Sequence, residues 1–169
     1  MKNLFLTIYY KLISANKVAL KVGVKFGKNC HFGSKYFGSE PYLIEIGNDF
    51  KTSANVKYIT HDGSVNVLRN LYPELKDIDL FAKIKIGNNV FLGLDVVVLP
   101  GTIIEDNVIV GAGSIVRGHL QRNSVYAGVP VKFICTLEEY KLKHENTFVF
   151  TKHMKADEKY IFLKRYFGR

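Results

Sequence analysis

Aliphatic side chains recur at every sixth position through the middle of the chain. From residue 86 to residue 121 the sequence divides into six hexapeptides, IGNNVF, LGLDVV, VLPGTI, IEDNVI, VGAGSI and VRGHLQ. The first position is always aliphatic, and the fifth is mostly small or β-branched. These columns contain Ile86, Leu92, Val98, Ile104, Val110 and Val116, and Val90, Val96, Thr102, Val108, Ser114 and Leu120, respectively. A fixed period of six residues is typical of a parallel β-helix.

A six-residue unit suits one side of a triangular coil. A short strand and its turn use about six residues, so residues about 18 apart stack on neighbouring rungs roughly 4.8 Å apart. The first position then points inward. Glycine at the second position, as in Gly87, Gly93 and Gly111, permits a tight corner. An amphipathic α-helix is disfavoured because its period is 3.6 residues and because Pro100 interrupts the segment.

The hexapeptide pattern continues upstream with two interruptions. Residues 26–37 and 46–57 each form two more hexapeptides, but the step from position 26 to position 46 is longer than one coil of three hexapeptides. The first interruption is the segment GSEP at 38–41. In the second, residues 63–84, the pattern disappears, and we expect a loop extruded from the coil. Long loops inside compact domains are commonly functional.

The two ends of the chain have helical rather than hexapeptide spacing. It covers residues 3–20, 136–144 and 155–167, and Thr136 or Thr151 could cap a helix. We therefore divide the chain into an N-terminal helical cap (1–21), a β-helix domain (22–134) and a C-terminal helical tail (135–169). Helical ends cover the open strand edges of a solenoid. The last helix mixes basic and apolar residues, so peripheral membrane contact is an alternative role for it.

Composition is that of an ordinary globular protein. The chain has 169 residues, of which 47% are hydrophobic and 23% charged, which favours one domain with a real core. It has no apolar run long enough for a membrane span. Cys30 and Cys135 are too few and too far apart for a disulfide framework or a zinc site. With no clear secretion signal, these features predict a cytoplasmic protein.

The net charge of +9 is unevenly distributed. Residues 86–116 contain three acids and neither lysine nor arginine, whereas the segments on either side are basic. Basic ends could meet an anionic cofactor, a nucleic acid or a membrane surface, or simply keep the protein soluble. No nucleic-acid recognition motif accompanies the charge, so we expect no nucleic-acid partner.

Residues 22–134 resemble the hexapeptide-repeat acyltransferases of the left-handed parallel β-helix superfamily, in particular the sugar and polysaccharide O-acetyltransferases related to maltose and galactoside acetyltransferases. The motifs that carry the resemblance are GVKFGKNCHFGS (23–34), SEPYLIEIGNDF (39–50), ITHD (59–62), IGNNVFLG (86–93), LPGTII (99–104), VGAGSIV (110–116) and AGVPVK (127–132). The resemblance implies a left-handed coil, acetyl-CoA as donor, and a homotrimer with active sites between subunits. The fold class expected is all-β, with short terminal helices.

Acyl transfer to an alcohol requires a base, because a hydroxyl is a poor nucleophile until its proton is taken during attack. His61 matches the catalytic histidine of the family, and a neutral imidazole can serve near pH 7. Its other ring nitrogen needs an orienting acceptor. Glu40 and Asp62 are the candidates.

The resemblance also implies a donor site. Backbone contacts to CoA are expected at Gly93, Leu94, Gly111 and Ala112, because the two glycines stack one coil apart and would leave a groove for the pantetheine arm. Arg117 and Lys132 match positions near the CoA phosphates, and Pro130 would lie by the adenine.

The sequence departs from the family at the acceptor and phosphate positions. Phe91 stands where many relatives have tryptophan beside the acceptor, and Arg117-Gly118-His119 replaces a common Thr-Lys-Asp. In the extruded loop, Arg69, Asn70 and Tyr72 could hydrogen-bond a sugar, although the loop could equally pack on a neighbouring subunit.

The leading functional hypothesis is an acetyl-CoA-dependent O-acetyltransferase that modifies a sugar hydroxyl in surface polysaccharide (capsule, O-antigen or exopolysaccharide) and needs no metal. Acceptors such as an amino sugar, serine or a xenobiotic remain open, as does a catalytically inactive scaffold. A carbonic anhydrase would need three histidines around zinc, and His31, His61 and His119 lack the paired spacing.

Overall fold

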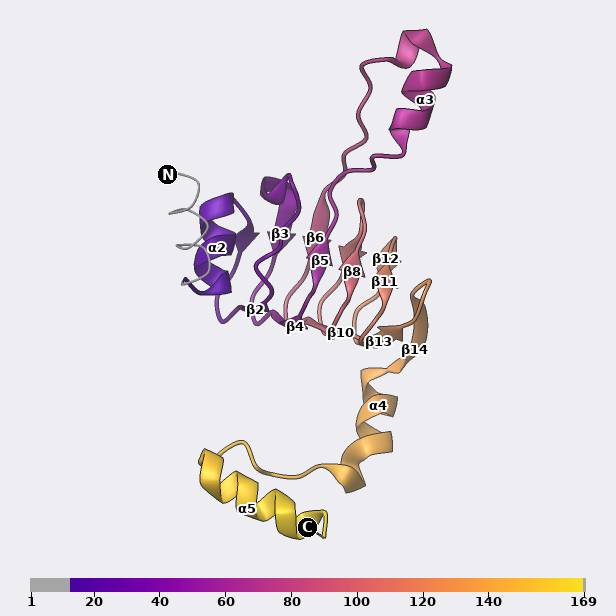
Figure 1. The fold of residues 1–169 in the computed structure, drawn as a ribbon. Helices are drawn as coiled ribbons and strands as arrows, with labels where there is room; N and C mark the ends of the chain where they lie inside the picture. The colour runs from indigo at the N-terminus through magenta and orange to yellow at the C-terminus, as the bar shows by residue number, and fades with distance from the viewer. Residues whose placement is uncertain (1–12, 169) are drawn as a thin grey trace.

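Short parallel strands form three sheets that wrap into a triangular coil, in a computed structural model that describes residues 13–168 (Figure 1). Face A contains β1 (Lys25–Phe26), β3 (Ile44–Ile46), β6 (Ile84–Ile86), β9 (Ile103–Ile104) and β12 (His119–Leu120). Face B contains β2 (His31–Gly33), β4 (Lys51–Ala54), β7 (Phe91–Leu92), β10 (Val108–Val110) and β13 (Ser124–Ala127), and face C contains β5 (Lys57–Tyr58), β8 (Val97–Val98) and β11 (Ile115–Val116). The predicted parallel β-helix is confirmed.

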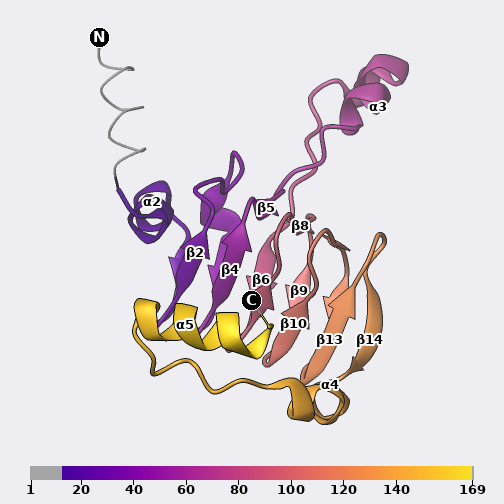
Figure 2. The same ribbon diagram turned by 60° about the horizontal axis from the view of Figure 1, so that its bottom comes forward.

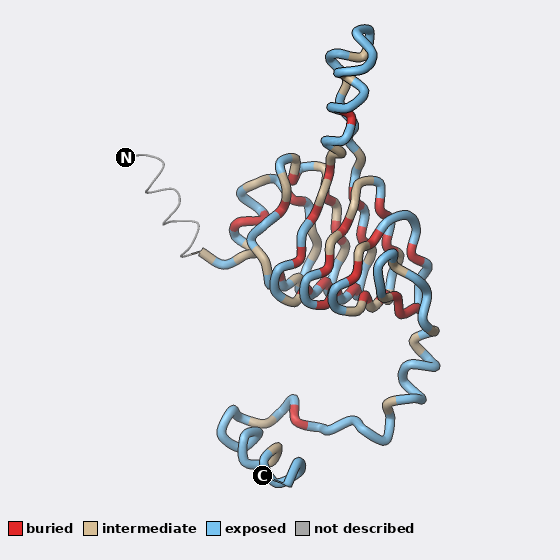
Figure 3. Tube along the Cα trace, turned by 45° about the vertical axis from the view of Figure 1, so that its right-hand side comes forward, coloured by how far each residue is buried: buried red, intermediate tan, exposed pale blue. Residues whose placement is uncertain are grey.

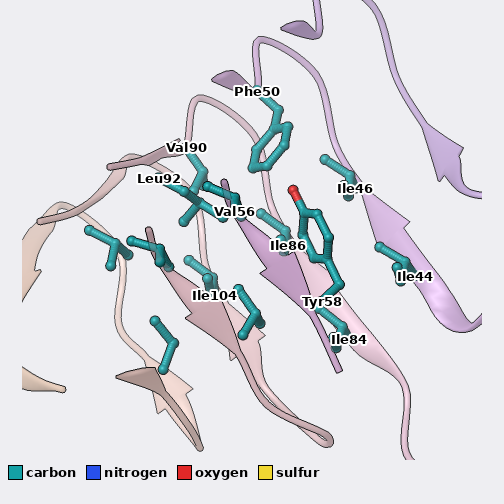
Figure 4. Close-up of a cluster of buried hydrophobic side chains, with 14 of the residues drawn as sticks. Ile44, Ile46, Phe50, Val56, Tyr58, Ile84, Ile86, Val90, Leu92 and Ile104 are labelled. Carbon is teal, nitrogen blue, oxygen red and sulfur yellow. The ribbon is translucent and has the colours of Figure 1, made fainter. Parts of the chain in front are cut away.

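The column predicted to point inward, the first position of each hexapeptide, is buried in the coil, and so is the column of fifth positions, for which burial was not predicted. Every one of their residues is at most 5% exposed. Figure 3 shows buried positions recurring along the strands, and Figure 4 shows Ile86, Leu92 and Ile104 among the side chains gathered inside. Each fully buried aliphatic side chain contributes roughly 1.5–3 kcal/mol. The two polar members are satisfied, because Thr102 Oγ1 donates to Leu99 O at 2.7 Å and Ser114 Oγ to Gly111 O at 2.7 Å.

The corner between faces A and B, the AB corner, carries a ladder of amides that the sequence analysis missed. Successive coils place there a residue in the left-handed backbone region, with φ between 53° and 58°. These residues are Asn29, Asp49, Asn89, Asn107 and Asn123. Asn89 Nδ2 donates to Asn107 Oδ1 at 2.8 Å, and Asn107 Nδ2 to Asn123 Oδ1 at 2.9 Å. Asparagine and aspartate tolerate this conformation better than other residues with a side chain.

Coil length varies along the stack. Ile86 pairs with Ile104 across a regular coil of three hexapeptides. Phe26 pairs with Ile46 across a longer coil, and Ile46 pairs with Ile86 across the coil that contains the extruded segment.

The last coil is short, because Ile104 pairs with Leu120 rather than with a residue three full hexapeptides on. The assignment of Leu120 to the fifth position is therefore wrong. The sixth hexapeptide is two residues shorter than the others, and the missing residues fall at the turn between faces C and A. Leu120 therefore takes the inward position that Ile104 has one rung earlier.

Residues 59–83 form an arm that projects from the corner between faces C and A, the CA corner (Figures 1 and 2). The segment is extruded from the coil as expected, but it is not a simple loop, since it contains α3 (Val65–Leu71) and the 3-10 turn η2 (Pro73–Leu75). The coil resumes with β6 at Ile84, the residue at which the loop was expected to end. Another 3-10 turn, η1 (Pro41–Leu43), occupies the same corner one coil earlier.

A helix covers the first rung of the coil. This helix is α2 (Ala15–Val22), which Ser14 caps and which buries Val18 and Ala19 against the core. It accounts for residues 15–21 of the predicted N-terminal cap, and residues 1–12 of that segment lie outside the described residues. The close packing of α2 on β2 hides the strand edge that would otherwise be open.

The far end of the coil is closed by a hairpin and followed by two helices. Strand β14 (Lys132–Thr136) pairs antiparallel with β13, so β structure continues two residues past the expected boundary at 134. Thr136 caps α4 (Leu137–His144) in a capping box with Glu139, as predicted. After the 3-10 turn η3 (Glu145–Thr147), α5 (Ala156–Tyr166) starts at an N-cap of Lys155 rather than Thr151.

No helix within residues 13–168 combines the length and apolarity needed to cross a membrane.

Candidate active site

The CA corner gathers polar side chains from successive coils. The two lengthened coils place Glu40 and His61 there, one rung apart, and the shortened coil places Arg117 two rungs beyond His61. The extra residues in the coil that starts at Phe26 accommodate the turn before η1 that carries Glu40. The register slip seen in the sequence is therefore the feature that brings Glu40 to His61.

His61 and Glu40 form a close pair. His61 Nδ1 lies 2.9 Å from Glu40 Oε2, and Thr60 Oγ1 donates to the same carboxylate oxygen at 2.8 Å. Hydrogen bonding from His61, with a further bond from Thr60, holds the pKa of Glu40 below its ordinary value. With Nδ1 occupied, Nε2 is the ring nitrogen that can receive a substrate proton. The His61 side chain is 44% exposed, so a substrate can reach it.

Asp62, the alternative orienting residue, serves the base of the extruded arm. Its Oδ1 accepts a hydrogen bond from Ser64 N at 2.9 Å, and its own N–H donates to Leu80 O at 2.9 Å. Hydrogen bonding from Ser64 lowers the pKa of Asp62, and the nearby cation of Arg117 lowers it further. Of the two carboxylates named from sequence, the geometry places Glu40, and not Asp62, at the imidazole.

His61 lines a pocket of about 280 Å³ between the coil and the root of the arm. Asp62 and Arg117 supply the charges of this pocket, and its remaining walls are mostly apolar. They come from Ile59, Leu80, Ala82, Leu99 and Pro100. The pocket is at the small end for ligand sites, which suits a single ring such as one sugar unit. Arg117 is exposed and lines the pocket, and no hydrogen bond or ion pair joins its guanidinium to another residue in the span 13–168.

Apart from Arg117, the predicted donor residues lie at or near the next corner, between faces B and C, the BC corner. Gly93 N donates to Val110 O at 2.8 Å and Gly111 N to Tyr126 O at 2.8 Å, so both N–H groups belong to the ladder. A Cβ on Gly93 would stand 2.5 Å from Ala112 N. Close rung contact therefore explains Gly93 without any ligand. Leu94, Ala112, Pro130 and Lys132 are exposed near this corner. Of the predicted donor residues, only Arg117 is in the His61 pocket.

The residues predicted to bind the acceptor are dispersed. Arg69 holds the arm together, because its guanidinium donates to Ile78 O and pairs with Asp79. Asn70 and Tyr72 are exposed on the arm outside the lining of the His61 pocket. Phe91, 42% exposed, lies on face B and lines a separate groove of about 760 Å³. For Phe91 and His61 to meet one acceptor, they would have to come from different subunits.

Histidines, cysteines and acids do not gather as a metal site requires: across residues 13–168 no three of them form such a group. His119 Nε2 instead pairs with Glu105 Oε1 at 2.8 Å on the outside of the coil.

Comparison with known proteins identifies the family to which this coil belongs. Residues 83–118 match the model of the bacterial transferase hexapeptide family, described as six repeats. The chain belongs to the hexapeptide-repeat acetyltransferases, and its coil is the left-handed β-helix of that family.

Three known proteins illustrate the relationship. Protein CapG of Staphylococcus aureus is 44% identical over 166 residues, which cover 96% of this chain and 94% of CapG. The Escherichia coli protein WbbJ, provisionally a lipopolysaccharide biosynthesis O-acetyl transferase, is 49% identical over 65 residues, 38% of this chain and 33% of WbbJ. A solved galactoside acetyltransferase in complex with coenzyme A shares the fold with a TM-score of 0.52 at 23% identity, covering 84% of this chain and 86% of that one.

Proposed function

We propose that this chain is an acetyl-CoA-dependent O-acetyltransferase that modifies a sugar hydroxyl during surface polysaccharide synthesis in the cytoplasm. The observation that carries the proposal is the pair of His61 Nδ1 and Glu40 Oε2, 2.9 Å apart, at the mouth of a pocket sized for one sugar ring. The names of WbbJ and of the galactoside acetyltransferase point to the same reaction and to a sugar acceptor.

His61 acts as the general base. Acetyl-CoA supplies an activated acyl group, the thioester. Nε2 of His61 takes the proton of the acceptor hydroxyl as its oxygen forms the new ester bond to the acetyl carbon. When the carbon–sulfur bond breaks, the same nitrogen returns the proton to the thiolate, so the histidine ends neutral. Glu40 holds Nδ1–H and stabilises the transient imidazolium.

The donor is expected at the BC corner. Exposed Leu94 and Ala112 offer backbone and apolar surface to the pantetheine arm, beside Gly93 and Gly111, and Lys132 with neighbouring Pro130 suits the phosphate and adenine end. One face of the coil separates this corner from His61. A homotrimer, in which the BC corner of one subunit faces the CA corner of the next, brings donor and base together.

The test is thiol release on mixing the protein, acetyl-CoA and a panel of sugars. We expect free thiol only when both substrates are present, with a sugar hydroxyl acetylated in the product. Preference for amino sugars, serine or xenobiotics would change the acceptor class. No thiol release, together with no thermal shift by millimolar acetyl-CoA, would support an inactive scaffold and refute the proposal.

Replacing Glu40 with glutamine is expected to lower kcat about 10²-fold with little change in the KM for acetyl-CoA, because the neutral amide cannot stabilise the imidazolium. Since the pKa of Glu40 is lowered in the folded protein, the carboxylate stays ionised as the pH falls and loses this role only below its shifted pKa. The control is Glu45→Gln, which removes the same charge from a pair with Lys83 on face A. Equal kcat for Glu40→Gln and wild type would remove Glu40 from the mechanism.

Two exposed cations are expected to serve different substrates. Lys132→Ala should weaken acetyl-CoA binding about 3- to 10-fold, the loss of one charge-assisted contact. Arg117→Ala should leave that Kd within about twofold and raise the KM for the acceptor, because Arg117 lines the His61 pocket. Isothermal titration with acetyl-CoA and acceptor kinetics measure both. The reverse outcome would return Arg117 to the CoA phosphates, as the family resemblance implies.

A further inference from the structure

A short turn of the coil holds Arg117 at a defined place in the CA corner. Arg117 and Gly118 alone separate β11 from β12, and Gly118 has a φ of 85°, which glycine adopts without strain. Val116 O, one residue before Arg117, accepts a hydrogen bond from Leu99 N at 2.9 Å. Gly118 O, one residue after it, accepts one from Ile103 N at 2.9 Å. The backbone that carries Arg117 is therefore fixed on both sides.

The charge of Arg117 is not neutralised at contact distance. Across residues 13–168 no carboxylate forms an ion pair with its guanidinium. The acid of the same pocket is Asp62, whose Oδ1 accepts a hydrogen bond from Ser64 N at 2.9 Å. Hydrogen bonding from Ser64 lowers the pKa of Asp62, and the Arg117 cation adds to this effect over a distance longer than an ion pair. Asp62 thus moderates the charge of Arg117 without contacting it.

The walls around Arg117 are poor in hydrogen-bond acceptors. Apart from His61 and Asp62, the residues that line the pocket with Arg117 are apolar, namely Ile59, Leu80, Ala82, Leu99 and Pro100. A sugar that enters this pocket displaces water from the guanidinium. Removing water from a cation is costly unless an opposite charge takes its place. A ligand that brings its own anion therefore suits the pocket better than a neutral ligand of the same shape.

The geometry of the corner allows one ring to contact both Arg117 and His61. The planar guanidinium matches a carboxylate or a phosphate group through paired N–H donors. Arg117 lies two rungs beyond His61, which corresponds to about 10 Å between their backbones at the spacing of parallel strands. A sugar ring can span that distance, with a hydroxyl at His61 and an anionic group at Arg117. Holding the ring at two points would select which hydroxyl reaches His61.

We propose that the sugar acceptor carries an anionic group, either a ring carboxylate or a phosphate joined to the sugar, and that Arg117 binds this group while His61 takes the hydroxyl proton. The inference rests on the function proposed above and narrows its acceptor from sugars in general to acidic ones. It makes Arg117 a specificity-determining residue for the acceptor and leaves the CoA phosphates to Lys132.

The first test compares pairs of acceptors that differ in one anionic group. The methyl glycosides of galacturonic acid and galactose differ in a carboxylate, and glucose phosphorylated at its anomeric oxygen differs from methyl glucoside in a phosphate. Thiol release with acetyl-CoA measures kcat/KM for each. We expect kcat/KM to be at least about tenfold higher for the acidic member of one pair, the scale of one charge-assisted contact. The pair that shows this preference identifies the anion. No preference for either acidic member would overturn the proposal.

Substitutions assign the preference to one side chain. Arg117→Gln should bring the ratio of acidic to neutral kcat/KM within about twofold of unity, because the amide keeps hydrogen-bond donors but loses the charge. Arg117→Lys keeps the charge without the paired donors and should give an intermediate ratio. Arg122→Gln is the control, since Arg122 pairs with Glu105 outside the pocket. A preference that survives Arg117→Gln, or that Arg122→Gln abolishes equally, would overturn the assignment.

Binding without turnover separates this inference from the enzymatic function. Calorimetric titration of the same sugars, without acetyl-CoA, should show tighter binding of an acidic member to the wild type and no such difference for Arg117→Gln. That result without thiol release from acetyl-CoA would support the anion subsite and overturn the enzymatic function. Thiol release with neutral sugars alone would leave the enzymatic function standing and overturn this inference.

Discussion

Replacing His61 with alanine is expected to lower kcat about 10²- to 10⁴-fold while acetyl-CoA still binds within about twofold. The range is that of a positioned general base, and His61 is the histidine that lines the pocket at the CA corner. Its Nδ1 is already held by Glu40, so alanine removes both the base and the group that Glu40 orients. Thiol release at saturating substrates measures kcat, and titration with acetyl-CoA measures binding.

His119→Ala is the matched control for this prediction. His119 also pairs with a glutamate, Glu105, at 2.8 Å, but it lies outside the pocket. Its removal should leave kcat near the wild-type value. If His61→Ala kept substantial turnover, or if His119→Ala lost as much, His61 would not be the base.

The second large effect is expected at Gly93. Valine there should destabilise the fold by about 3 kcal/mol, at the upper end of the cost of overpacking, because its Cβ would lie 2.5 Å from Ala112 N and 2.9 Å from Gly111 C. Those atoms are backbone of the next rung and cannot rotate away. Urea unfolding of the variant measures the loss.

The result at Gly93 separates two roles of this glycine. A groove for pantetheine predicts a stable variant that binds acetyl-CoA poorly, whereas rung contact predicts a destabilised one. Gly63→Val is the control, since Gly63 has no heavy atom within 4 Å of the added Cβ and lies at the root of the extruded arm. Equal stability of the two variants would refute the steric argument.

The coil could be predicted because burial repeats with a fixed period. Ile86, Leu92 and Val98 face inward for one physical reason, and the hexapeptide recurs often enough to exclude an α-helix. The amide ladder also has a sequence signal, because residues 29, 49, 89, 107 and 123 are all asparagine or aspartate. It was overlooked because these polar residues read as ordinary turn residues until the coils are stacked.

Features that depend on the length of an individual coil were harder to predict than the coil itself. Glu40 and Asp62 were both candidates for the partner of His61. The register break about one coil earlier favoured Glu40, but the sequence did not fix how the inserted turn orients its carboxylate. Leu120 was assigned to the wrong column because a deletion of two residues leaves an apolar residue at nearly the expected spacing. The helix α3 was missed because it packs little against the coil, so no long apolar period marks it.

The sequence of one chain does not predict how the donor site and the acceptor site come together. Gly93 and His61 sit at different corners, and the periodicity of a single chain carries no information about which corner of a neighbour each one faces. Arg117 illustrates the difficulty, since its family position pointed to CoA and its actual neighbours are His61 and Asp62.

Because the coils differ in length mainly at one corner, the residues that select the acceptor can change while the scaffold stays the same. Apart from a one-residue shift between β2 and β4, the chain gains and loses residues at the CA corner, while the AB corner keeps a stacked amide ladder that any insertion there would break. Segments at the CA corner can therefore be exchanged, lengthened or trimmed without disturbing the rest of the stack. A lineage built on this coil can acquire new acceptors by changing one edge of the prism, while the edge that we assign to the donor is left as it was.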